Sequence, residues 1–262
     1  MRRDARVPNV LPNARPSVRR GVALVLVLWL VVVLAGVGAS VAVAVHGRLR
    51  VAANLRDRAV ARLAAESGVV VAARAIEDTL SVLGEGNARR AYLDGIETGP
   101  AADEALGDAR FRVALVDPSA RLDVNAASED ALARFFAPFA GAAAARAVAR
   151  EIRGRVGGAR PGEVATPFLS VDALGTLRSL DPRAAEAAAP YLTVDGDGSV
   201  NRVTAPPPVR AAAAGQLVDE PTRLVVVSRG WRAGAALTHE IQAVYAVQGT
   251  QLALVRWRER DL

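Results

Sequence analysis

Oxygen-bearing side chains alternate with small residues in the stretch DGDGSVN, residues 195–201. Asp195 and Asp197 stand at ligand positions of the first half of a calcium-binding loop, because Ca²⁺ prefers carboxylate and carbonyl oxygens. However, Val200 occupies the sixth position, where such loops need glycine, and no glutamate closes the loop at the twelfth. The pattern favours a flexible turn, with Asp195 and Asp197 as weak candidates for a metal site.

Residues suited to other chemistry are scarce. The chain has no cysteine and only two histidines, His46 and His239, which argues against disulfides, thiolate metal sites and histidine-rich clusters. It contains no G-x-S-x-G elbow, phosphate-binding P-loop, H-E-x-x-H motif or dinucleotide fingerprint. We therefore predict that the protein is not an enzyme. A membrane-anchored enzyme remains an alternative, because acidic and hydroxyl groups that converge only in the fold cannot be seen in one sequence.

The basic charge does not indicate a polyanion partner. The net charge is +6, yet every basic residue counted is arginine, and arginines alternate with Asp and Glu along most of the chain. A nucleic-acid surface needs clustered basic residues. Nucleic acid is therefore not expected as a partner.

The elements that position these residues begin with an uncharged segment, residues 21–45, preceded by several arginines. About 20 apolar residues suffice to cross a bilayer. The arginine excess should keep the preceding leader in the cytoplasm and place the C-terminal bulk outside. A cleaved secretion signal is the alternative, with Ala42-Val43-Ala44 as its cleavage site.

No helix breaker separates the apolar segment from the residues after it. Residues 46–83 mix apolar and charged side chains at helical spacing, and the first proline after the leader is Pro100. The sequence therefore predicts one long helix that is apolar at first and amphipathic later.

A basic leader ending in Arg19-Arg20-Gly21, followed by such a helix, resembles type IV pilins and type II secretion pseudopilins. Most members carry glutamate at the fifth mature position, whereas counting from Val22 places Leu26 there. The start Arg20-Gly21-Val22-Ala23-Leu24 is similar to the minor pseudopilin K family, general secretion pathway protein K. The resemblance implies cleavage by a prepilin peptidase between Gly21 and Val22 and methylation of Val22.

The missing carboxylate has a physical interpretation. A carboxylate inside a bilayer is costly unless it is paired, and in pilin filaments the fifth residue is thought to neutralise the N-terminal amine of a neighbouring subunit. A subunit at the tip has no earlier neighbour to match. Leu26 therefore avoids a desolvation cost, and with Trp29 and Leu34 it is assigned to the membrane anchor.

Patterning along the outer region predicts strands around a group of helices. Residues 111–117 alternate as a strand, and three further strands are expected at 222–230, 236–247 and 250–260. Between them, Ser128, Ser170 and Asp181 are predicted helix N-caps, and a further helix is expected at 142–155, ending at Gly157-Gly158.

Two loop-to-helix transitions resemble each other, since residues 123–127 can be laid over residues 201–205. Such transitions are similar to helix-hairpin-helix motifs, so a membrane-anchored DNA-binding protein of the competence type is the alternative function. The turn at residues 139–143 keeps one glycine and has no basic residue, which weakens that alternative. The same layout resembles the inserted helical domain of the pseudopilin K family, with departures at Asp123, Ala126, Val203 and Arg210.

The predicted fold class is α+β: a pilin-like long N-terminal helix packed on a small antiparallel sheet, with an inserted all-helical domain. The expected segments are a leader (1–21), the pilin helix (22–83), a loop and first strand (84–120), the helical domain (121–208) and the C-terminal strands (209–262).

The predicted function is that of a minor pseudopilin of the type II secretion system at the pseudopilus tip, where it initiates or caps assembly. The resemblance implies four kinds of partner: other minor pseudopilins (I, J and H type), the major pseudopilin, the prepilin peptidase and the inner membrane. No cofactor is assigned; the resemblance is compatible with bound calcium, although its ligands cannot be mapped residue by residue.

Overall fold

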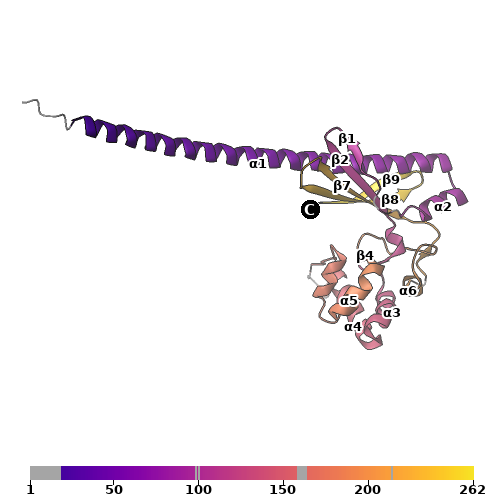
Figure 1. Cartoon of the computed structure of the whole chain (residues 1–262). Helices are drawn as coiled ribbons and strands as arrows, with labels where there is room; N and C mark the ends of the chain where they lie inside the picture. The colour runs from indigo at the N-terminus through magenta and orange to yellow at the C-terminus, as the bar shows by residue number, and fades with distance from the viewer. Residues whose placement is uncertain (1–18, 98, 100, 158–163, 214) are drawn as a thin grey trace, which may run out of the picture. The chain divides into compact units, whose positions relative to one another are not determined.

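The computed structural model describes residues 19–97, 99, 101–157, 164–213 and 215–262 (Figure 1). The chain divides into two compact units, Met1–Leu55 and Arg56–Leu262. The described residues of the first unit all belong to helix α1.

Helix α1 spans Arg19–Leu83 and confirms the expected continuous helix. Its window Leu24–Val41 has a mean hydropathy of 2.8, and none of this window is buried. By length and composition, this part of α1 can cross a membrane.

The second unit contains a five-stranded sheet in the order β1-β2-β7-β8-β9, in which every pair is antiparallel. The strands are β1 (Glu104–Leu106), β2 (Ala109–Val116), β7 (Arg223–Arg232), β8 (Thr238–Gln248) and β9 (Gln251–Asp261). The four expected strands are therefore confirmed. The prediction that a loop precedes the first strand within residues 84–120 is wrong in part, because residues 104–106 pair with β2 as a short edge strand and because α2 (Asn87–Asp94) lies in this segment.

The second half of α1 packs very closely on one face of this sheet. Small residues make the contact, since Ala61, Ala64 and Ala65 are at most 1% exposed and Gly230 lies beneath them. A Cβ atom added to Gly230 would lie 2.3 Å from both the Ala61 carbonyl oxygen and the Ala65 amide nitrogen. Further along α1, Ile76 and Leu80 pack against Leu224.

A helical lobe is inserted between β2 and β7, which are adjacent in the sheet, so the expected interruption of the sheet in sequence is confirmed. Its helices are α3 (Glu129–Ala140), α4 (Ala142–Gly157), η2 (Val171–Thr176), α5 (Pro182–Ala188), η3 (Ala189–Tyr191) and α6 (Pro207–Ala212). Four two-residue strands join them in parallel pairs: β3 (Leu122–Asp123) with β4 (Leu192–Thr193), and β5 (Val200–Asn201) with β6 (Leu217–Val218).

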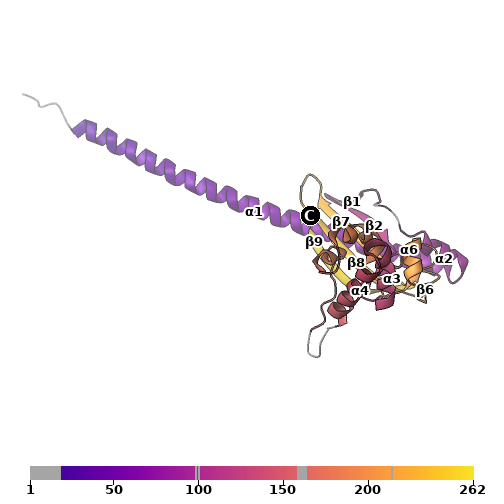
Figure 2. The same ribbon diagram turned by 90° about the horizontal axis from the view of Figure 1, so that it is seen from below.

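The lobe has its own apolar core, in which Phe135, Phe136 and Phe168 are fully buried. Val209 and Ala212 of α6 belong to this core, so the lobe extends beyond the expected limit at residue 208. Figures 1 and 2 show the lobe and the second half of α1 on opposite faces of the sheet.

Of the three predicted N-caps in the lobe, two are confirmed. The Ser128 hydroxyl accepts a hydrogen bond from the Ala131 amide, and the Asp181 carboxylate accepts from the Arg183 and Ala184 amides. The prediction that Ser170 caps a helix is wrong, because its side chain makes no capping hydrogen bond and η2 is a 3₁₀-helix.

The expected similarity of residues 123–127 and 201–205 is confirmed by their hydrogen bonds. Asp123 Oδ1 accepts from the amides two and three residues later, at 2.7 and 2.8 Å. Asn201 Oδ1 accepts from the corresponding amides at 2.8 and 3.3 Å. The two residues differ at the other polar atom of the side chain. Asn201 Nδ2 donates to Asp94 at 2.8 Å, whereas the buried Asp123 Oδ2 has no partner among the described residues.

Candidate functional site

The expected anchor residues lie on the exposed surface of α1. Leu26, Trp29 and Leu34 are 65%, 71% and 61% exposed. Large apolar side chains are rarely left in water over so long a stretch, and a continuous exposed apolar surface marks contact with a membrane or another protein. The geometry of these residues fits an anchor.

The expected processing residues, Gly21 and Val22, fall within the bounds of α1. Their side chains lie outside the part that the structure describes, as do residues 1–18 of the expected leader. The cleavage assignment therefore stays a prediction.

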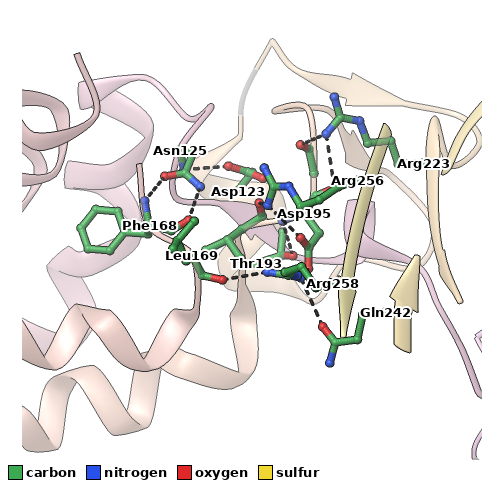
Figure 3. Close-up of polar contacts among 12 residues, drawn as sticks. Asp123, Asn125, Phe168, Leu169, Thr193, Asp195, Arg223, Gln242, Arg256 and Arg258 are labelled. Atoms are coloured by element: carbon green, nitrogen blue, oxygen red, sulfur yellow. Dashed lines mark hydrogen bonds and ion pairs between the residues drawn. The ribbon is translucent and has the colours of Figure 1, made fainter. Parts of the chain in front are cut away.

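The weak metal candidate Asp195 lies where the lobe meets the sheet (Figure 3). Its Oδ1 accepts from Arg256 Nη1 at 3.1 Å, and its Oδ2 accepts from Arg258 Nη2 at 2.5 Å. Both arginines come from β9, so one carboxylate of the lobe binds two strand side chains. We call Asp123, Asp195, Arg223, Arg256 and Arg258 the lobe–sheet junction.

The same arginines also bind lobe carbonyls. Arg258 Nη1 donates to the Leu169 carbonyl at 2.7 Å, and Arg256 Nη1 donates to the Val194 carbonyl at 3.0 Å. Arg223 of β7 donates to the Gly196 carbonyl. Because charged hydrogen bonds of this kind are directional, the junction fixes the orientation of the lobe on the sheet.

Asp123 is the more deeply buried of the two carboxylates of the junction. It is 2% exposed, and burial raises the pKa of its carboxyl above the ordinary value despite hydrogen bonds from the Ala126 and Asn125 amides. Gly196 packs against it, since an added Cβ there would lie 3.1 Å from Asp123 Oδ2. A neutral side chain would fit this position at lower cost.

Asp197, the second metal candidate, is bound by hydroxyl groups. Its Oδ1 accepts from the Ser199 hydroxyl at 2.5 Å, and its Oδ2 accepts from the Thr222 hydroxyl at 2.9 Å. Burial alone would raise the pKa of Asp197, but the Ser199 and Thr222 hydrogen bonds hold it below the ordinary value.

These partners do not fit a calcium site. Calcium needs six to eight oxygen ligands that converge on one point. Asp195 instead faces two guanidinium groups, and among the described residues no three acidic or histidine side chains are grouped to hold a metal. The described donor set gives no support to the calcium implied by the resemblance.

A cavity of about 440 Å³ lies beside the junction. Glu240, one of its lining residues, has a side chain only 1% exposed and accepts from Arg229 Nε at 2.7 Å and Arg260 Nη2 at 2.6 Å. Burial would raise the pKa of Glu240, but the hydrogen bonds from Arg229 and Arg260 hold it below the ordinary value. These charge pairs link β7, β8 and β9 across the sheet, so they stabilise the strands beneath the cavity.

The sequence pattern identified Asp195 and Asp197 but not their partners. The arginines of β9 recur at alternate positions, 256, 258 and 260, which places them on one face of a strand. That spacing was the available signal. It could not show that this face meets the lobe, some 60 residues earlier in the chain.

Comparisons with known proteins give a family-model match and a structural match. Residues 20–70 match the family model described as PilX N-terminal. The chain is also similar to one chain of the crystal structure of the GspK-GspI-GspJ complex from the enterotoxigenic Escherichia coli Type 2 Secretion System. The two chains share 11% identity, the match covers 74% of this chain and 96% of that chain, and the TM-score is 0.49. No curated protein gives a significant match.

The first match confirms the pilin-like N-terminal segment expected from the sequence.

Proposed function

We propose that the protein is a minor pseudopilin of a type II secretion system that sits at the pseudopilus tip and initiates or caps assembly. The observation that carries the proposal is the combination of a pilin-like N-terminal helix with a bulky lobe inserted between two adjacent strands of the sheet. Such a lobe would block the addition of a further subunit on that side. The helix would remain available to other minor pseudopilins (I, J and H type) and to the major pseudopilin.

Leu26 supports the tip position. A carboxylate at this point would need a neighbouring amine, because the cost of burying an unpaired charge in a bilayer is several kcal/mol (about 2.5–3.5 on insertion scales). The tip subunit has no such neighbour. The protein's work in this role is helix packing and burial of surface rather than bond chemistry.

The mature N-terminus tests the membrane part of the proposal. We expect mass spectrometry of the full chain, purified from the membrane, to give a terminus at methylated Val22 after cleavage by a prepilin peptidase. A Gly21→Arg variant serves as the control and should keep the leader. An intact Met1, or a terminus after Ala44, would count against the pseudopilin.

Deletion of the lobe tests the tip function. Val116 of β2 pairs with Val225 of β7, so a short Gly/Ser linker in place of residues 118–222 would join two adjacent strand ends without cutting the sheet. We expect the variant to insert in the inner membrane, with its C-terminal part in the periplasm, and to be processed at Val22 while secretion is lost. Normal secretion by this variant would contradict the tip-cap role.

A further inference from the structure

β9 is a long open edge of the sheet. Among the described residues it pairs only with β8 and lies at one end of the strand order, and its 11 residues exceed the 3 of β1 at the opposite edge. An edge strand presents unpaired peptide groups that can bind a further strand.

The outward-facing peptide groups can be assigned from the register. The Leu262 amide donates to the Thr238 carbonyl at 2.8 Å, while Asp261 stands opposite His239. Asp261 and His239 therefore form a pair without mutual hydrogen bonds. By alternation, the peptide groups of Trp257, Glu259 and Asp261 point away from β8.

The usable edge is the second half of β9. In the first half the Leu252 amide already donates to Glu77 Oε1 at 2.9 Å, and the register shifts between Val244 and Tyr245, leaving Val255 without an opposite residue. Beyond this bulge the pairing is regular from Arg256 to Asp261.

Arginine side chains follow this edge on the face that meets the lobe. On this face, three arginines of β9 and one arginine of β7 bind only two carboxylates, Asp195 and Glu240. The arginines are Arg229, Arg256, Arg258 and Arg260. The face therefore keeps a surplus of positive charge. Arg260, with 61% of its side chain exposed, is the most accessible of the three on β9.

A second copy of the chain does not complement this edge. If two copies of β9 paired antiparallel about a two-fold axis, the arginine side chains of both copies would lie on the same face of the joined sheet. In every register an arginine of one copy would then stand opposite an arginine of the other. These would be the pairs without mutual hydrogen bonds, in which Cα atoms are only about 4.5 Å apart and like charges repel.

We propose that the outer edge of β9, from Arg256 to Asp261, binds an extended segment of a different protein that carries acidic residues at alternate positions. The segment would add an antiparallel strand beside β9. Its acidic side chains would stand opposite the arginines, and its intervening peptide groups would bond to those of Trp257 and Glu259. This inference goes beyond the proposed function, because it concerns the sheet edge and would stand if the lobe had another role.

A synthetic peptide tests the proposal on the full chain in detergent. The probe is acetyl-Val-Glu-Val-Glu-Val-Glu-Val-amide carrying a fluorescent label, and binding is followed by fluorescence anisotropy. We expect saturable binding that is at least about tenfold weaker when the valine amides are N-methylated, since the hydrogen bonds from these amides to the outward carbonyls of β9 are removed. A Val-Lys peptide, and a peptide with the same composition in the order Glu-Glu-Glu-Val-Val-Val-Val, should bind at least about tenfold more weakly as well.

Trp257→Pro tests the edge from the protein side. Proline removes an outward amide and leaves the β8 ladder intact, so peptide affinity should fall at least about tenfold relative to the matched Trp257→Ala variant. Equal binding of the native and N-methylated peptides would overturn the proposal even if Trp257→Pro fails to fold. A dimer of the full chain that is present in Trp257→Ala and lost in Trp257→Pro would also overturn it, because the occupant would then be a second copy.

Discussion

Replacing Gly230 with alanine tests the close packing of α1 on β7. The added Cβ would lie 2.3 Å from the Ala61 carbonyl oxygen and 2.3 Å from the Ala65 amide nitrogen, whereas ordinary contacts begin at 3.4 Å. Both neighbours are backbone atoms of a helix, so no side-chain rotation can relieve the overlap. The helix must move by about 1 Å away from the strand, which opens the packed core beside it.

The expected cost follows from this geometry. Overpacking a core typically costs about 1–3 kcal/mol, and the backbone clash places Gly230→Ala at the upper end, at about 3 kcal/mol. For a unit of this size, the unfolding temperature should fall by about 6–12 °C.

Thermal unfolding of the full chain in detergent checks this value, with tryptophan fluorescence as the readout because Trp231 follows Gly230 in β7. Gly175→Ala is the matched control, since an added Cβ there meets no atom within 4 Å. If the two variants unfold at the same temperature, the close packing of α1 on β7 is refuted.

The remaining predictions concern two buried polar groups, Asp123 and Ser228, and one exposed carboxylate, Asp261. Asp123→Asn should raise the free energy of unfolding by about 1–3 kcal/mol at neutral pH, relative to the exposed control Asp219→Asn. The pKa of Asp123 is raised in the folded state, so as pH falls the folded carboxyl gains its proton before the unfolded one does. The stability advantage of Asp123→Asn should therefore shrink as pH falls through the raised pKa. An advantage that stays constant with pH would refute this prediction. The pKa of Asp261 is lowered, first by its hydrogen bond with His239, so Asp261→Asn should destabilise at neutral pH. That loss should vanish as pH falls through the lowered pKa, and a loss that persists in acid would contradict it. Ser228→Ala should stabilise by about 1 kcal/mol in thermal unfolding, because the fully buried Ser228 hydroxyl has no partner among the described residues; destabilisation would show a missed hydrogen bond.

Much of the fold could be predicted because its determinants are local. The absence of a helix breaker before Leu83 predicts the length of α1, and alternating apolar residues predict β2, β7, β8 and β9. Ser128 and Asp181 cap helices because their side chains reach amides two or three residues away.

Weaker local signals failed where distant contacts decide the outcome. β1 is three exposed residues whose strand conformation depends on pairing with β2. α2 is held in part by Arg89, which donates to the Gly249 carbonyl at 2.7 Å from a position far earlier in the chain. Ser170 has the right residue type for a cap, but its side chain makes no capping hydrogen bond.

The candidate site shows the same division. The sequence by itself determined the uncharged anchor around Leu26 and the oxygen-rich stretch at Asp195 and Asp197, because composition and spacing within a short segment suffice for both. Only the tertiary structure decided that Asp195 binds arginines of β9 rather than grouping with other acids for a metal. The physical reason is that an ion pair depends on which side chains lie close together in space, and Asp195 and the β9 arginines are 61 and 63 residues apart in the chain.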